Sequence, residues 1–206
     1  MENKITIFIR RKQSKLLTGG LVKTSNKILL SCLTLLLASS IYAQKPVIVD
    51  EFAGQIEFVQ GRITQLANAV PQSAYEWRPA DGVRSVSEVY LHTAFANYMT
   101  VTITGGKVPE DVGFEMDFSK SNAWDTQTTD KTIILEKVNE SFAILKERVN
   151  NLTEEDLNKE IEFFGMKMSI RNFMITMIGH LHEHLGQSIA YARINGVTPP
   201  WSKNEG

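Results

Sequence analysis

The chain has 206 residues, of which 43% are hydrophobic and 22% charged, the composition of an ordinary globular protein with one core. Residues 1–43 hold seven of the 22 Lys and Arg residues and one of the 23 acids, so the remainder carries 15 bases and 22 acids, a net charge of −7. Because phosphate backbones are bound by basic surfaces, this acidic body argues against nucleic acid as a partner.

The first 43 residues are typical of a signal peptide. Lys23 and Lys27 precede an apolar run over residues 28–37, and small and polar residues then lead to a cleavage site after Ala43. The run is short for a membrane span, so we expect no stable span in the mature chain; an uncleaved anchor is the alternative. The prediction is a signal peptide over residues 1–43 and a single domain over residues 44–206, which is periplasmic or secreted.

Cysteine chemistry is excluded from the predicted mature chain. The only cysteine, Cys32, lies inside the predicted signal peptide. Disulfides, thiol nucleophiles and thiolate metal ligands are therefore not expected in the domain.

Two amphipathic helices are expected in the first half of the mature chain. Apolar residues recur every three or four positions over residues 50–69, with Asp50 as the expected N-cap. A second helix is predicted over residues 85–102, where Ser85 and Glu88 have the spacing of a capping box.

Residues 107–129 are expected to form a long connection, because Pro, Gly and polar residues interrupt any apolar pattern there. A connection of this length is either functional or a crossover between distant helices. A third helix is predicted over residues 130–152, followed by a short capped turn over residues 153–157 and a small hairpin around Phe164-Gly165. The fourth helix is predicted over residues 169–195.

These elements predict an all-α fold. Four long amphipathic segments and almost no strand indicate a four-helix bundle with a long crossover connection and a small hairpin before the last helix. The odd connection between the second and third helices indicates that the topology is not simply up-down-up-down. Bundles of this size commonly pair through exposed helix faces, so the sequence leaves a homodimer open.

Three of the four histidines fall on predicted inward faces of helices. His180 and His184 are four residues apart and share one face of the last helix, where they interrupt an apolar stripe over residues 173–191. His92 lies on the inward face of the second helix. His182 points to another side of the last helix and is expected to be solvated or to pack at the surface.

Inward imidazoles are unfavourable unless a partner satisfies them, and three neutral imidazoles suit Zn²⁺, Ni²⁺, Co²⁺ or Fe²⁺. We predict that His92, His180 and His184 bind one divalent metal ion and leave a position open to water, as in catalytic sites. The pattern is not the H-E-x-x-H motif, because Leu181 follows the first histidine and Glu183 is turned away from the inward face.

Several further residues have two interpretations. Glu88 either supports His92 from one turn away or serves only in the capping box. Gly186 is expected to allow close helix packing, and Gln187 either packs or supports a metal ligand. Four aromatic residues could line a pocket or fill the core: Trp77, Tyr98, Tyr191 and Trp201.

The motifs resemble those of the DinB-like (YfiT-like) family over about residues 50–201. The matches are Trp77-Arg78-Pro79 before the second helix, Ser85, Glu88 and His92 on it, residues 180–187 on the last helix, and residues 194–200. The resemblance implies a four-helix bundle with a long crossover, and metal ligands at His92, His180 and His184. Some members of that family are metal-dependent thiol transferases or isomerases, which act in the cytosol, and many have no known reaction. This sequence departs from them in its exported location and in Leu185, where members often carry Arg.

The sequence therefore predicts an exported metal-dependent enzyme, a hydrolase or a transferase, acting on an unidentified small molecule. The alternative is a non-catalytic bundle that binds a metal or a small ligand, which is favoured by the lack of a Glu or Asp base on the inward stripe. A third interpretation is a structural bundle whose histidines are hydrogen-bonded and metal-free.

Overall fold

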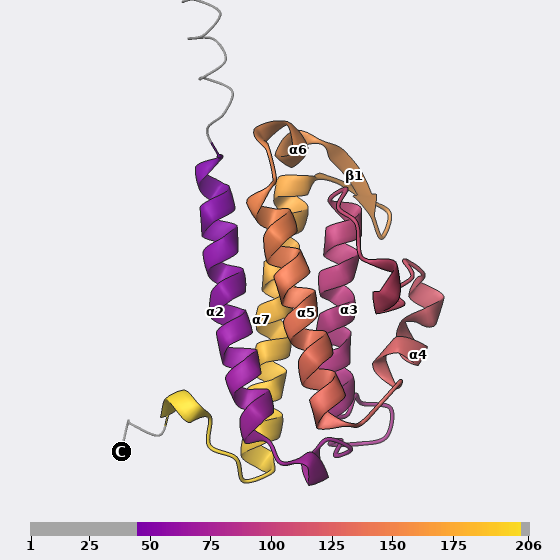
Figure 1. Cartoon of the computed structure of the whole chain (residues 1–206), viewed down its shortest axis with the longest axis vertical. Helices are drawn as coiled ribbons and strands as arrows, with labels where there is room; N and C mark the ends of the chain where they lie inside the picture. Colours follow the sequence, from indigo (N-terminus) through magenta and orange to yellow (C-terminus); the bar gives the residue numbers. More distant parts are fainter. Residues whose placement is uncertain (1–44, 203–206) are drawn as a thin grey trace, which may run out of the picture. The chain divides into compact units, whose positions relative to one another are not determined.

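The computed structural model describes residues 45–202, so the predicted signal peptide lies outside the described residues. The four predicted long helices are present as α2 (Val47–Ala69), α3 (Val86–Ile103), α5 (Lys131–Asn150) and α7 (Ile170–Ile194) (Figure 1). The shorter elements are η1 (Gln72–Ala74), η2 (Glu110–Val112), η3 (Phe118–Lys120), α4 (Ser121–Asp125), α6 (Glu154–Asn158), β1 (Glu160–Phe163), β2 (Met166–Ser169) and η4 (Pro200–Ser202). No helix in this described part is long and apolar enough to cross a membrane.

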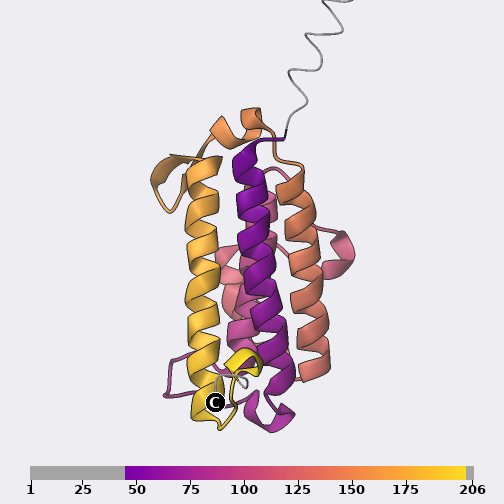
Figure 2. The ribbon, with the colours of Figure 1, turned by 90° about the vertical axis from the view of Figure 1, so that its left-hand side faces the viewer.

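The direction of the helices explains the long connection. α3 and α5 run the same way, and α2 and α7 run the opposite way (Figure 1). The main contacts of α2 are with α5 and α7, and α3 likewise packs against α5 and α7, so α2 and α3 lie diagonally across the bundle. Figure 2 shows α2 between α5 and α7. The predicted topology is confirmed, but α3 and α5 are neighbours and not distant helices. The connection between them is long because they are parallel, so it must return along the bundle from the end of α3 to the start of α5.

Helix starts follow local rules, with one correction. The predicted capping box is present, with the Glu88 amide donating to Ser85 Oγ (3.3 Å) and the Ser85 amide donating to Glu88 Oε2 (2.9 Å). Asp50 is not an N-cap, because α2 begins directly after Pro46. The Pro46 carbonyl accepts the amide of Val49 at 2.9 Å, and the earlier start buries the Val49 side chain completely.

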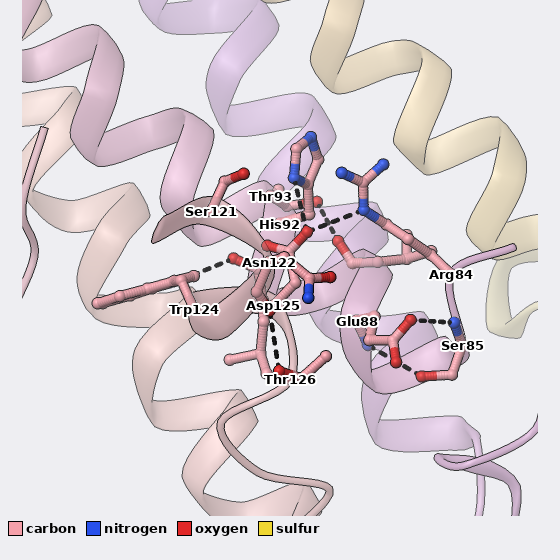
Figure 3. A network of polar contacts seen from close by, with 12 residues as sticks. Arg84, Ser85, Glu88, His92, Thr93, Ser121, Asn122, Trp124, Asp125 and Thr126 are labelled. Atoms are coloured by element: carbon pink, nitrogen blue, oxygen red, sulfur yellow. Dashed lines mark hydrogen bonds and ion pairs between the residues drawn. The ribbon is translucent and has the colours of Figure 1, made fainter. Parts of the chain in front are cut away.

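The connection between α3 and α5 contains a short helix, α4, that the sequence did not predict. Trp124 anchors it: the indole Nε1 donates to the Leu91 carbonyl at 3.1 Å, and the ring packs edge-on against Tyr98. α4 therefore covers a side of α3 that would otherwise face solvent, and α3 is buried along nearly its whole length. This docking places Asp125, the last residue of α4, beside α3 (Figure 3).

The predicted hairpin is confirmed. β1 and β2 pair in antiparallel fashion, with Phe163 opposite Met166, so Phe164 and Gly165 form a two-residue loop. Both loop residues have positive φ, 49° and 77°, as a type I′ turn requires. The hairpin leads directly into α7, whose N-cap Ser169 accepts the amide of Asn172.

Candidate metal centre

His92 from α3 and His180 and His184 from α7 meet inside the bundle. One ring nitrogen of each lies within 4.8 Å of the others. The ring centroids are 4.4 Å apart for His180 and His184, and 4.9 and 5.4 Å from His92 to His184 and His180. The ring planes stand at 72–89° to one another, so the imidazoles meet edge to face instead of stacking. The structure thus brings together the three predicted residues, while their binding of a metal stays a prediction.

The cluster is closed at one end and open at the other. His184 is buried, with 8% of its surface exposed. The side chains of His92 and His180 are 15% and 28% exposed. Access from solvent therefore runs past His180.

Hydrogen bonds set the tautomer of His184. The Tyr191 hydroxyl donates to the Arg84 carbonyl at 3.1 Å and accepts from Gln187 Nε2 at 2.9 Å. Gln187 therefore turns its Oε1 toward His184 Nδ1, 3.0 Å away, and this acceptor keeps the proton on Nδ1. Of the two interpretations of Gln187, the structure favours support of a candidate ligand.

His184 Nε2 is left as a buried acceptor. It has no hydrogen-bond partner among residues 45–202 and is inaccessible to solvent. Buried polar atoms are almost always paired, so an orphaned nitrogen needs a partner. A divalent cation held by the Nε2 lone pair fits this requirement, and the two neighbouring imidazoles supply further nitrogen ligands of the kind such cations prefer.

Asp125 supports His92, a role that the sequence analysis missed. The carboxylate is buried, and its Oδ2 lies 3.1 Å from His92 Nδ1 and accepts from Arg84 Nε at 2.9 Å (Figure 3). The acceptor keeps the His92 proton on Nδ1, which leaves Nε2 available as a ligand. The only sequence signal was weak: an aromatic residue, Trp124, directly before an acid in a segment without helical periodicity.

Glu88 does not support His92. Its carboxylate accepts from Arg78 Nη2 at 2.5 Å as well as from the Ser85 amide, so the capping interpretation is the one the structure favours. Glu183 is turned outward as expected, with a side chain that is 78% exposed and 3.8 Å from His180 Nδ1.

Other predicted roles lie outside the cluster. His182 packs at the surface, as expected, against the Phe58 ring (centroids 6.1 Å apart) and near Gln55 Oε1 (3.1 Å). The prediction for Gly186 is wrong: it lies on the exposed side of α7, where an added Cβ would meet nothing within 4 Å. The residues of α7 that pack against other helices lie on other faces of this helix, so none of the described helices approaches Gly186.

The four aromatic candidates serve the core or its edge. Tyr98 is fully buried, and its hydroxyl donates to Glu140 at 3.3 Å. Trp77 packs edge-on against Tyr191, and Trp201 lies under the guanidinium of Arg62. Only Tyr191 reaches the cluster, through its hydrogen bond with Gln187.

The environment keeps two of the imidazoles neutral. The pKa of His180 is lowered to about 4, first by burial and then by the neighbouring histidines. Burial also lowers the pKa of His184 to about 4, although its hydrogen bond with Gln187 opposes the shift. Neutral imidazoles are the form that binds metal ions, so both rings are ready as ligands at neutral pH.

We expect the metal-free protein to lose stability as the pH falls from 7 to 5. Because the pKa of His180 and His184 is lowered from 6.5 to about 4 in the folded state, the unfolded chain binds protons first. The stabilisation is complete above pH 6.5 and is lost as the pH falls toward 4; between pH 7 and 5 the loss is roughly 3–4 kcal/mol for the pair. Urea unfolding with a chelator present measures this, and a profile matching that of a variant with Leu at both positions would contradict it.

Two depressions adjoin the cluster. One is an apolar cavity of about 220 Å³ lined by His92, His180 and side chains from α3, α7, the hairpin and the crossover. The other is a polar cleft of about 660 Å³ lined by Arg78, Arg84, Asp125 and Gln187, among others. Ser121, at the start of α4, lines both. The candidate centre thus lies between an apolar and a polar space.

The fold is similar to that of several solved proteins. A DinB-like protein from Bacillus cereus ATCC 10987 is 21% identical, with a TM-score of 0.61, over 73% of this chain and 95% of that one. YfiT from Bacillus subtilis, described as a probable metal-dependent hydrolase with an unusual four-helix bundle topology, is 15% identical, with a TM-score of 0.56, over 76% and 93%. A mycothiol-dependent maleylpyruvate isomerase is 13% identical, with a TM-score of 0.53, over 70% and 61%.

The comparison with curated proteins finds no match. A family model of the DinB superfamily matches residues 55–188, which include all three clustered histidines, Asp125 and Gln187. This match covers more than half of the chain. The chain belongs to the DinB superfamily.

Proposed function

We propose that this protein is a metal-dependent hydrolase whose divalent cation is held by His92, His180 and His184. The observation that carries the proposal is the buried His184 Nε2, which has no partner in the described chain and belongs to a ring 4.4 and 4.9 Å, between centroids, from two further imidazoles. When bound, such a cation supplies Lewis-acid chemistry, which polarises a substrate carbonyl or lowers the pKa of water.

The surrounding residues orient the ligands. Asp125 holds the proton of His92 on Nδ1, and its ion pair with Arg84 fixes the position of the carboxylate. Gln187 holds the proton of His184 on Nδ1, and Tyr191 fixes the direction of the Gln187 amide. With both Nδ1 atoms engaged, each ring offers only Nε2 to a cation.

Two observations support hydrolysis over group transfer. The sequence after residue 43 contains no cysteine, which excludes covalent transfer through a thiol of the domain itself. The side chain of His180 is 28% exposed, so water has a path to the cluster. The description of the structural neighbour YfiT as a probable metal-dependent hydrolase agrees with this choice.

A non-catalytic binding bundle is the second candidate. The buried acid nearest to the cluster, Asp125, is engaged by His92 and Arg84 and therefore does not serve as a free general base. A protein of this kind would bind the same ion through the same three histidines and would turn over no substrate.

Metal analysis and hydrolysis assays separate these candidates. We expect about one divalent ion per purified wild-type chain, little in His180→Ala, and the full amount in His182→Ala, a matched control two residues away. Hydrolysis of a panel of small esters and amides should disappear with chelator and return when the metal is restored. A metal-free wild-type protein would overturn the proposal, and full metal occupancy without hydrolysis would favour the binding bundle.

We also propose that the protein is exported. The basic residues, apolar run and small residues before Gln44 support this proposal. N-terminal sequencing of protein recovered outside the cytoplasm should begin at Gln44, and recovery of the protein only from the cytoplasm would contradict export.

A further inference from the structure

We propose that the substrate carries a compact apolar group that binds in the cavity beside His92 and His180, beneath the side chains of Phe118 and Phe164. This inference rests on the proposed function, because the cavity is assigned to the substrate on the ground that two proposed metal ligands, His92 and His180, form part of its wall. It names a substrate class: a carboxylic ester or amide with an aromatic or branched hydrocarbon group next to the reacting carbonyl.

The cavity has the character required for such a group. Its wall is apolar apart from the two histidines and two hydroxyl-bearing residues, and includes Phe95, Met99, Phe163 and Met177. A dry cavity of about 150 Å³ accommodates benzene, so the volume of about 220 Å³ here holds a ring with a substituent. Because His92 and His180 line the same space, a carbonyl attached to that ring would lie next to the candidate metal ligands.

The covering residues come from two separate segments. Phe118 lies in the crossover and is 45% exposed, and Phe164 lies at the tip of the hairpin and is 70% exposed. Their ring centroids are 4.9 Å apart, and both residues line the cavity. Exposed rings gain little from folding but gain from a ligand that removes them from water, so their position at the cavity favours a binding role.

The backbone at Phe164 supports the same conclusion. Its φ of 49° lies in the left-handed region, which is unfavourable for a bulky side chain, and the first position of a type I′ turn normally carries Asn or Gly. The hairpin would therefore fold at least as well with Asn at this position. A large aromatic residue at a strained and exposed position indicates selection for something other than stability.

The polar cleft defines the other end of the substrate. It meets the apolar cavity at Ser121 and is lined by Arg78, Arg84 and Gln187. A molecule with its reacting carbonyl at the cluster would place its apolar group in the cavity and its polar portion toward this cleft. The two spaces thus favour an amphiphilic small molecule over a uniformly polar one.

Two hydroxamates test the inference, because both bind a metal through the same head group and differ only in the attached group. The probes are acetohydroxamate and benzohydroxamate, titrated into the cobalt-loaded full-length protein and followed by the visible absorption of Co²⁺. We expect benzohydroxamate to bind the wild type at least about tenfold more tightly, since its phenyl group buries apolar surface.

The main variant is Phe164→Asn, with Phe58→Asn as the control: Phe58 is half exposed but does not line the cavity. Phe164→Asn should reduce the preference for benzohydroxamate to about threefold or less, leave acetohydroxamate affinity unchanged, and keep or raise the Tm. Phe58→Asn should keep the full preference.

Two results would overturn the inference: equal affinities of the wild type for the two probes, or a preference that survives in both Phe164→Asn and Phe118→Ser. Either result would leave the proposed function intact, since acetohydroxamate would still report a bound metal. A wild-type protein that binds neither cobalt nor acetohydroxamate would refute the proposed function, and this inference with it.

Discussion

Replacing His184 with leucine is expected to lower the affinity for a divalent metal ion by about a hundredfold or more while leaving the metal-free protein at least as stable as the wild type. Structural zinc sites bind their ion with apparent free energies of about 10–16 kcal/mol, so each of three or four ligands contributes on the order of 3 kcal/mol. In the metal-free state the buried Nε2 is unsatisfied, which disfavours folding by about 1–3 kcal/mol, and leucine removes this atom while filling a similar volume. Zinc titration and thermal unfolding in chelator measure the two effects.

His182→Leu is the matched control, because His182 lies on the same helix and contacts Phe58 and Gln55 instead of the cluster. It should bind zinc like the wild type. If the metal-free His184→Leu variant instead unfolds several kcal/mol more easily, His184 is a satisfied core residue. The protein would then be a structural bundle whose histidines bind no metal.

Replacing Asp125 with asparagine is expected to lower metal affinity by about 10–100-fold with little change in packing. The carboxylate accepts the Nδ1 proton of His92, whereas an asparagine amide can donate to Nδ1 and so move the proton to Nε2. A protonated Nε2 cannot bind a cation, so the variant would retain the shape of the site and lose one ligand in its correct form. Competition with a chromogenic chelator gives the affinity.

Asp130→Asn provides the comparison for this change. Asp130 caps α5 by accepting the amides of Thr132 and Ile133, and asparagine is an equally good N-cap. Its zinc affinity should therefore equal that of the wild type. Unchanged affinity in Asp125→Asn would show that the carboxylate does not control the His92 tautomer, and that its pair with Arg84 serves stability alone.

The helices and the histidine cluster were predictable because their signals are local. Ser85 and Glu88 define a helix start from four consecutive residues, and His180 and His184 share a face by helical geometry alone. The inward direction of His92 followed from the same periodicity. The start of α2 was missed by three residues, because the capping pattern suggested Asp50 while the burial of Val49 extends the helix to Val47.

The residues that complete the site depend on contacts between distant segments. Asp125 belongs to a five-residue helix that is positioned by the docking of Trp124 on α3, which no local pattern encodes. Phe118 and Phe164 meet across 46 positions of sequence, and their meeting requires the crossover and the hairpin to reach the same end of α3. For Gly186 the sequence predicted a contact that the described residues do not make. A glycine within a helix suggested close packing, but the neighbouring helices contact other faces of α7.

The metal-site residues lie on helices and the residues that cover the cavity lie in connections, which affects how relatives of this protein can diverge. The three clustered histidines lie on α3 and α7, two long helices whose positions are fixed by the core, whereas Phe118 and Phe164 lie in a crossover and a hairpin. Connections tolerate insertion and substitution far better than core helices do. Changes confined to these two segments can therefore retune which molecules are accepted while the reactive centre stays as it is, which gives this bundle a route to new specificities at little risk to folding.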